Sequence, residues 1–331
     1  MFQRILVPLD GSARAAQAIP VAVRIARAEG GSLALLTAIP PLDEWGWQDS
    51  PLLSPEAQAE EQERVAMELT ALASSAPLAG IEVAQKAVLG DPATTILASA
   101  QLQQMDLIVL CSHGRTGLKR WALGSVAQKV ARHSPVPVLI LREGESGLFN
   151  EEPQIHPVRM MIALDGSPLA ESVIQPALEL SVALSAPVPG ALHLVRVLPF
   201  SNDFDYGQED AVAKARRQDV QEARTYLHEL QKRLIGENPD LYVMTSLAMS
   251  MDIAETLLTV AEMGEGEGMS AITSTSDIIA LATHGRSGPA RWVMGSVTER
   301  VLGATRLPLL IVRPPQAGGL PMRQEASRTA S

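Results

Sequence analysis

The chain has 331 residues, of which 46% are hydrophobic, 19% charged and 3% aromatic, and this length fits two domains of ordinary size with aliphatic cores. Its formal net charge of −10 and its few aromatic side chains argue against binding to nucleic acid or to an anionic membrane surface. A single cysteine excludes an intrachain disulfide, and neither a signal peptide nor an apolar run of about 18 residues is present, so we expect a cytoplasmic protein.

The first half of the chain alternates apolar, strand-like runs with helical patterns. Strands are predicted over 5–9, 33–39, 81–88, 106–110 and 136–141, and helices over 13–28, over 54–74 and from about 91 and 125 onward. Uninterrupted apolar strands separated by helices are typical of a parallel sheet that is covered on both faces. The pattern therefore predicts a βαβαβαβαβ domain of the α/β class.

The second half repeats this order. Strands are predicted over 160–164, 191–198, 241–247, 277–281 and 308–312, and helices over 169–184, over 209–234 and from 252 and 296 onward. Residues 112–126 (SHGRTGLKRWALGSV) are echoed by residues 283–297 (THGRSGPARWVMGSV), and a repeat of this length indicates two copies of one domain. We assign 1–143 and 158–313 to the two domains, 144–157 to a linker and 314–331 to a disordered tail.

The repeated block has the features of an anion site. In each copy two glycines are separated by nine residues, and the second is followed by a serine that opens a helix: Gly124-Ser125 and Gly295-Ser296. Backbone N–H groups at such a helix start attract phosphate, and glycine lets the ligand come close. Ser125 and Ser296 also fit the pattern of a capping box, which would explain them without any ligand.

A carboxylate follows the first strand of each half, at Asp10 and Asp165. Ligands of open α/β sheets bind beyond the carboxyl ends of the strands, where these groups can accept hydrogen bonds from ribose hydroxyls. An Asx turn or a helix cap explains both residues equally well. The sequence has no phosphate loop, zinc-ligand spacing or nucleophile-elbow motif, so the holding of a nucleotide is better supported than its turnover.

Together these residues resemble the universal stress protein A family. The resemblance rests on residues 8–12 (PLDGS) and on the repeated block, and it covers both halves. ATP-binding members carry G-x-x-G-x9-G-[ST]; here the last two glycines and the serine are present in both copies, whereas Cys111 and Ala282 replace the first glycine. The implied fold is two tandem open five-stranded parallel-sheet domains that are Rossmann-like, of the adenine nucleotide alpha hydrolase type.

The resemblance implies a sensor or regulator of a stress response that binds ATP, ADP or AMP, with Mg²⁺ or Mn²⁺ on the phosphates. The implied nucleotide-binding residues are Pro8, Asp10, Ala38, Cys111, His113, Gly114, Gly124, Ser125 and Val126, and in the second half Asp165, Val197, Ala282, His284, Gly285, Gly295, Ser296 and Val297. It also implies pairing of the two last strands within the chain, and a homodimer stays open. A scaffold without nucleotide and a slow ATPase or self-phosphorylating enzyme are the alternatives.

Overall fold

The computed structural model describes residues 2–40, 55–112, 123–142, 156–200, 209–264, 275–283 and 294–314. In the first half the strands are β1 (Arg4–Leu9), β2 (Ser32–Ile39), β3 (Val83–Leu89), β4 (Leu107–Cys111) and β5 (Val138–Leu141). The helices are α1 (Ala13–Ala16), α2 (Ala18–Glu29), α3 (Pro55–Ala73), the 3-10 turn η3 (Ala76–Leu78), α4 (Pro92–Leu102) and α5 (Ser125–His133).

The second half has the same order of elements. Its strands are β6 (Arg159–Leu164), β7 (Ala191–Pro199), β8 (Tyr242–Ser250), β9 (Ile278–Ala282) and β10 (Leu309–Val312). Its helices are α6 (Pro168–Glu171), α7 (Ile174–Ser185), α8 (Glu209–Glu237), α9 (Ile253–Met263) and α10 (Ser296–Ala304). None of the helices in the described parts of the chain is both long and apolar enough to cross a membrane.

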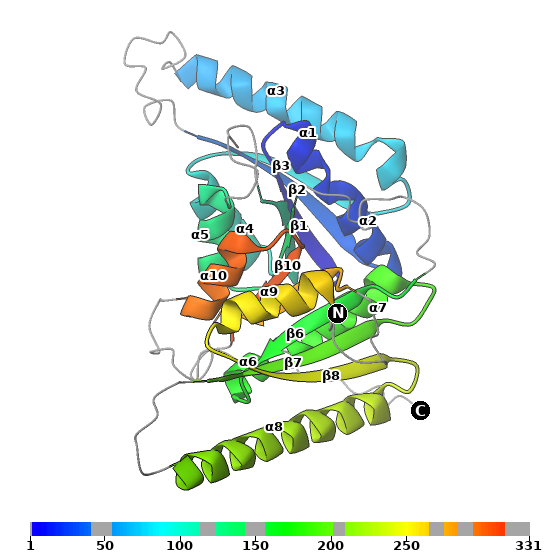
Figure 1. The fold of residues 1–331 in the computed structure, drawn as a ribbon. Coiled ribbons are helices and arrows are strands. Elements are labelled where there is room, and N and C mark those ends of the chain that lie inside the picture. The colour runs from blue at the N-terminus through cyan, green and yellow to red at the C-terminus, as the bar shows by residue number, and fades with distance from the viewer. Residues whose placement is uncertain are drawn as a thin grey trace, which may run out of the picture.

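All the strands join into one ten-stranded sheet in the order β3-β2-β1-β4-β5-β10-β9-β6-β7-β8 (Figure 1). Neighbouring strands are parallel within each half, and β5 and β10 pair antiparallel at the centre, where Leu139 lies opposite Leu310. The predicted α/β class with parallel five-stranded halves is therefore confirmed, as is the pairing of the two last strands within the chain.

Helices cover both faces of this sheet because its strands are apolar on both sides. One core cluster joins the sheet to α1, α2, α3, α6, α7 and α8, and the other joins it to α4, α5, α9 and α10. We call the side covered by the second set the α5/α10 face. Figure 1 shows α3 and α8 at opposite ends of the molecule, with α5 and α10 near its middle.

The prediction of one continuous helix over 13–28 and over 169–184 is wrong, because each of these helices is divided in two. The divisions lie between α1 and α2 and between α6 and α7. Pro20 and Pro176 lack the N–H group that would bond to the carbonyl four residues earlier, and their rings crowd that carbonyl. These carbonyls belong to Ala16 and Ser172, where the first helix of each pair ends or is capped.

Candidate functional site

The loops that follow β1 and β6 have the same geometry in both halves. The Oδ1 atom of Asp10 accepts hydrogen bonds from the backbone N–H of Ser12 at 3.0 Å and from its hydroxyl at 2.6 Å. Asp165 accepts from the backbone N–H of Ser167 at 2.8 Å. The intervening glycines have φ near +80°, a conformation that other residues rarely adopt. Both aspartates thus form the Asx turns that we considered as one explanation, at the carboxyl edge of the sheet.

The helices α5 and α10 begin on glycine rather than on serine. The carbonyl oxygens of Gly124 and Gly295 accept the first helical hydrogen bonds, both at 2.9 Å, and neither helix has a side-chain cap. The expectation that Ser125 and Ser296 cap the helices is therefore wrong. Each serine is the first helical residue and is exposed, because the extended conformation required of an N-cap falls on the preceding glycine, with ψ of 149° and 144°.

Backbone bonds attach these glycines to the ends of the central strands. Gly124 donates its N–H to the carbonyl of Ser112, and Gly295 donates to that of Thr283, both at 2.8 Å. The amides that follow belong to the first turn of each helix, where N–H groups have no partner within the helix and carry partial positive charge. Each half therefore presents the positive end of a nine-residue helix at the carboxyl edge.

The strand residues Pro8, Ala38 and Val197, which the family resemblance implies in nucleotide binding, lie on the same side as these helices. Val197 belongs to the core cluster of the α5/α10 face. Strand alternation puts Pro8 and Ala38 on that side, since each is two residues from a member of the same cluster. Ala163, which packs against the cluster, takes the place of Pro8 in the second half. The sequence analysis missed it because the two first strands share little beyond their apolar character.

The two residues that replace the first glycine of the family pattern face the other way. Cys111 packs against the core on the opposite face, with its Sγ atom 3.9 Å from the carbonyl oxygen of Ala15. Ala282 follows Leu281, a member of the α5/α10 cluster, so its side chain lies on the same opposite face. Neither side chain stands between the sheet and its glycine-opened helix.

Four of the predicted site residues, His113, Gly114, His284 and Gly285, lie outside the described residues. The other thirteen lie at the carboxyl edge of β1, β2, β4, β6, β7 and β9 or in the first turns of α5 and α10. In the parts of the chain that the structure describes, no group of three histidine, cysteine or carboxylate side chains could hold a metal ion.

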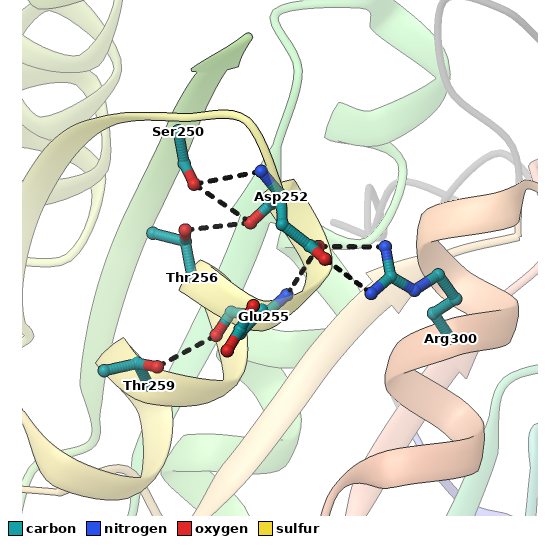
Figure 2. Close-up of polar contacts among 6 residues, drawn as sticks. All are labelled: Ser250, Asp252, Glu255, Thr256, Thr259 and Arg300. Atoms are coloured by element: carbon teal, nitrogen blue, oxygen red, sulfur yellow. Dashed lines mark hydrogen bonds and ion pairs between the residues drawn. The ribbon is translucent and has the colours of Figure 1, made fainter. Parts of the chain in front are cut away.

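An ion pair that the sequence analysis did not identify links the start of α9 to α10. Asp252 is the N-cap of α9, and its Oδ1 atom accepts the backbone N–H of Glu255 at 3.1 Å. The same carboxylate receives both terminal nitrogens of Arg300, Nη1 at 2.9 Å and Nη2 at 2.6 Å (Figure 2). This two-point contact lowers the pKa of Asp252 and raises that of Arg300.

The first half has the equivalent pair. Asp91, the N-cap of α4, accepts the backbone N–H of Thr94 at 2.9 Å and the Lys129 ammonium at 2.9 Å. The hydrogen bond from the Thr94 hydroxyl is the largest cause that lowers the pKa of Asp91 to about 2, followed by the bond from Lys129. Lys129 and Arg300 each lie four residues after the serine of the repeat, and that shared spacing was the signal available in the sequence.

The two halves also contact one another through α5 and α10. Arg132 of α5 lies 2.7 Å from the carboxylate of Glu299 in the first turns of α10. The buried guanidinium of Arg142, at the end of β5, donates to the carbonyl of Leu302, and burial lowers the pKa of Arg142 to about 10. The antiparallel strand pair and these contacts join the halves into one unit.

One difference between the halves lies on the face opposite α5 and α10. The guanidinium of Arg196 lies 5.3 Å from the centre of the Tyr226 ring and would stand 3.0 Å from a Cβ at Gly166, beside the Asp165 turn. The corresponding position in the first half is Thr37, and a Cβ at Gly11 would meet nothing within 4 Å. Among the described residues, a guanidinium therefore lies beside the Asp165 turn, whereas a threonine stands at the corresponding position beside the Asp10 turn.

Comparison with known proteins gives one consistent result. The sequence pattern of the universal stress protein family matches residues 1–142 and 158–313. A universal stress protein of Mycobacterium bovis is 24% identical over 96% of this chain and 97% of its own length. The crystal structure of one from Archaeoglobus fulgidus superposes with a TM-score of 0.63 at 18% identity, covering 95% of this chain and 99% of its own.

A further universal stress protein of known structure was solved in complex with cAMP. It matches 43% of this chain and 98% of its own, at 24% identity and a TM-score of 0.33.

Proposed function

The chain belongs to the universal stress protein family, and from that premise we propose that it binds an adenine nucleotide at the carboxyl edge of each half. In this proposal it acts as a sensor or regulator in a stress response. The observation that carries the proposal is the pair of helices that begin on an N-cap glycine followed by an exposed serine. Helix starts of this kind bind phosphate through backbone N–H groups.

The proposed roles follow the arrangement of the first half. The phosphates would lie at the start of α5, the ribose near Asp10, and the adenine along Pro8 and Ala38. This division is supported by the fact that both strand residues and α5 lie on the α5/α10 face. In the second half α10, Asp165, Ala163 and Val197 would have the same roles. An Mg²⁺ or Mn²⁺ ion would be held by the phosphates, since the described residues form no metal site of their own.

We also propose that 1–143 and 158–313 are the two domains, each with its own site, with 144–157 as linker and 314–331 as a disordered tail. A cytoplasmic location belongs to the same proposal and is supported by the single cysteine.

A scaffold without nucleotide is the second candidate. It is favoured by the Asx turns, which account for Asp10 and Asp165 with no ligand. It is also favoured by the guanidinium of Arg196, which lies beside the Asp165 turn. On this alternative the glycine and serine of each repeat serve only to start a helix.

Mass spectrometry of small molecules released by denaturing the purified full chain separates the two candidates. Nucleotide binding predicts one to two adenine nucleotides per chain, or a rise in melting temperature on adding ATP, ADP, AMP or cAMP to the empty protein. Cyclic AMP is included because a universal stress protein has been solved with it. A protein that is empty and gains no thermal stability from any of the four would favour the scaffold.

A further inference from the structure

The ion pairs Asp91–Lys129 and Asp252–Arg300 are not among the residues proposed to contact the nucleotide, yet both halves have them in equivalent places. Their chemistry differs in detail: the first half uses an ammonium with one contact, the second a guanidinium with two. Exposed ion pairs contribute little to stability. Stability alone is therefore a weak explanation for a pair placed twice at the same point of the fold.

Both pairs lie at the edge where the phosphates would bind. The helix α9 starts after the carboxyl end of β8, and α10 starts after that of β9, so the two helices begin at the same edge. They also contact one another (Figure 2). Arg300 lies one turn after Ser296, and long side chains on a helix lean toward its N-terminus. The contact with Asp252 is thus made beside the first turn of α10.

Few polar contacts of the described residues hold this first turn in place besides the pair of Glu299 with Arg132 of α5, and Val297 packs against the core. The N–H of Gly295 bonds to Thr283, and the hydroxyl of Thr298 bonds to the carbonyl of Ala282 at 2.9 Å. Both bonds run to neighbouring residues at the end of β9, so they attach the start of the helix to a single strand. The bond between Arg300 and Asp252 attaches α10 to a second element, the start of α9.

In the first half the contacts are fewer still. Ala127 stands where the second half has Thr298, and alanine has no hydroxyl to bond to the strand. Val126 and Ala127 pack against the core, and the described polar contacts of the first turn of α5 with other elements are the bond from Gly124 to Ser112 and, one turn later, the contact of Lys129 with Asp91.

From these contacts we infer that Asp91–Lys129 and Asp252–Arg300 are positioning pairs, each of which orients a glycine-opened helix so that its first N–H groups point at the nucleotide phosphates. This inference rests on the proposed function. The pair acts through the helix and does not touch the ligand. It therefore affects phosphate-bearing ligands and leaves the binding of adenosine, which has no phosphate, unchanged.

The test uses the full chain with three double variants. Lys129→Met with Arg300→Met removes both cations and keeps the apolar stems. Asp91→Asn with Asp252→Asn removes the charge and keeps the N-caps, because asparagine caps a helix as well as aspartate. Lys129→Arg with Arg300→Lys exchanges the cations between the halves and keeps both pairs. Arg64→Met, which breaks an exposed ion pair with Glu61 on α3, is the matched control.

Dissociation constants of ATP and adenosine are measured by fluorescence competition, and melting temperatures are measured in parallel. We expect both charge-removing variants to weaken ATP binding about two- to fivefold, the upper part of the range that corresponds to an exposed ion pair, with adenosine binding unchanged. The exchanged-cation variant and Arg64→Met should bind both ligands as the wild type does.

Three results would overturn the inference. Equal weakening of ATP and adenosine would assign the pairs a purely structural role. Unchanged ATP binding in both charge-removing variants would mean that the ion pairs do not affect phosphate binding. Tighter ATP binding in the asparagine variant, with weaker binding in the methionine variant, would mean that the released cations contact the phosphates directly. If the wild type itself binds neither ligand, the proposed function fails and the inference falls with it.

Discussion

Gly295→Ala tests whether the start of α10 binds phosphate. The backbone of Gly295, with φ −60° and ψ 144°, is open to alanine without strain. A Cβ at this position would lie 3.4 Å from the carbonyl oxygen of Thr283, an ordinary van der Waals contact. The folded state therefore accommodates the methyl group, while on the proposed function the same group would hinder the close approach of a phosphate to the first amides.

The expected magnitudes differ for folding and for binding. Alanine is a poorer N-cap than glycine, which we expect to cost at most about 1 kcal/mol of stability. The loss of one hydrogen bond to a charged group costs about 1.5–3 kcal/mol, or about 10- to 150-fold in affinity. The affected site is one of two, so the number of ATP molecules bound per chain should fall by one at concentrations that saturate the wild type.

Isothermal titration calorimetry with ATP measures both quantities, and Gly303→Ala is the matched control. Gly303 lies near the far end of the same helix, and a Cβ there would meet nothing within 4 Å. Alanine in place of a helical glycine should stabilise the protein by about 0.5–1 kcal/mol, with ATP binding unchanged. If Gly295→Ala binds ATP with the stoichiometry and affinity of the wild type, the start of α10 is not the phosphate site.

Three further predictions concern the fold. Leu139→Ala, at the fully buried centre of the antiparallel strand pair, should cost about 2–5 kcal/mol in urea unfolding, and a loss below 1 kcal/mol would contradict the view of this seam as core. Arg142→Ala leaves the carbonyl of Leu302 without its partner and should cost about 1–3 kcal/mol, against no loss for a surface arginine variant. The depressed pKa of Asp91, about 2, means that the aspartate stabilises the fold above the unfolded value of 3.8 and that this contribution is lost as the pH falls through about 2. In Asp91→Asn the free energy of unfolding should therefore fall less between about pH 4 and 2 than in the wild type. An equal fall in both proteins would refute the lowered pKa of Asp91.

The sequence predicted the elements well because they are set by local patterns. The apolar runs that became β1, β4, β6 and β9 are continuous, which predicts buried parallel strands, and the structure has them within one or two residues of the expected bounds. The division between α1 and α2 was missed although its cause, Pro20, was visible. The helical period of apolar residues continues through this proline, and that period by itself predicts a single helix.

The candidate site was predictable only in part. The glycine and serine of each repeat were identified from their spacing. The capping pattern assigned the N-cap to the serine, but in the structure the glycine is the N-cap. The pattern depends on residue type, whereas the N-cap is the residue whose ψ is extended. Asp91 and Lys129 lie 38 residues apart, and Asp252 and Arg300 lie 48 apart. No local pattern connects residues at such separations.

The sequence by itself determined the repeat, the α/β class and the approximate bounds of most strands and helices, because these depend on periodicity and on the conformations open to each residue type. Only the tertiary structure decided which glycines cap, which faces Cys111 and Ala282 occupy and which charges pair across helices. Those features depend on how segments far apart in the chain pack together. The same packing merged the two halves at β5 and β10, where burial of both strand edges favours one continuous sheet.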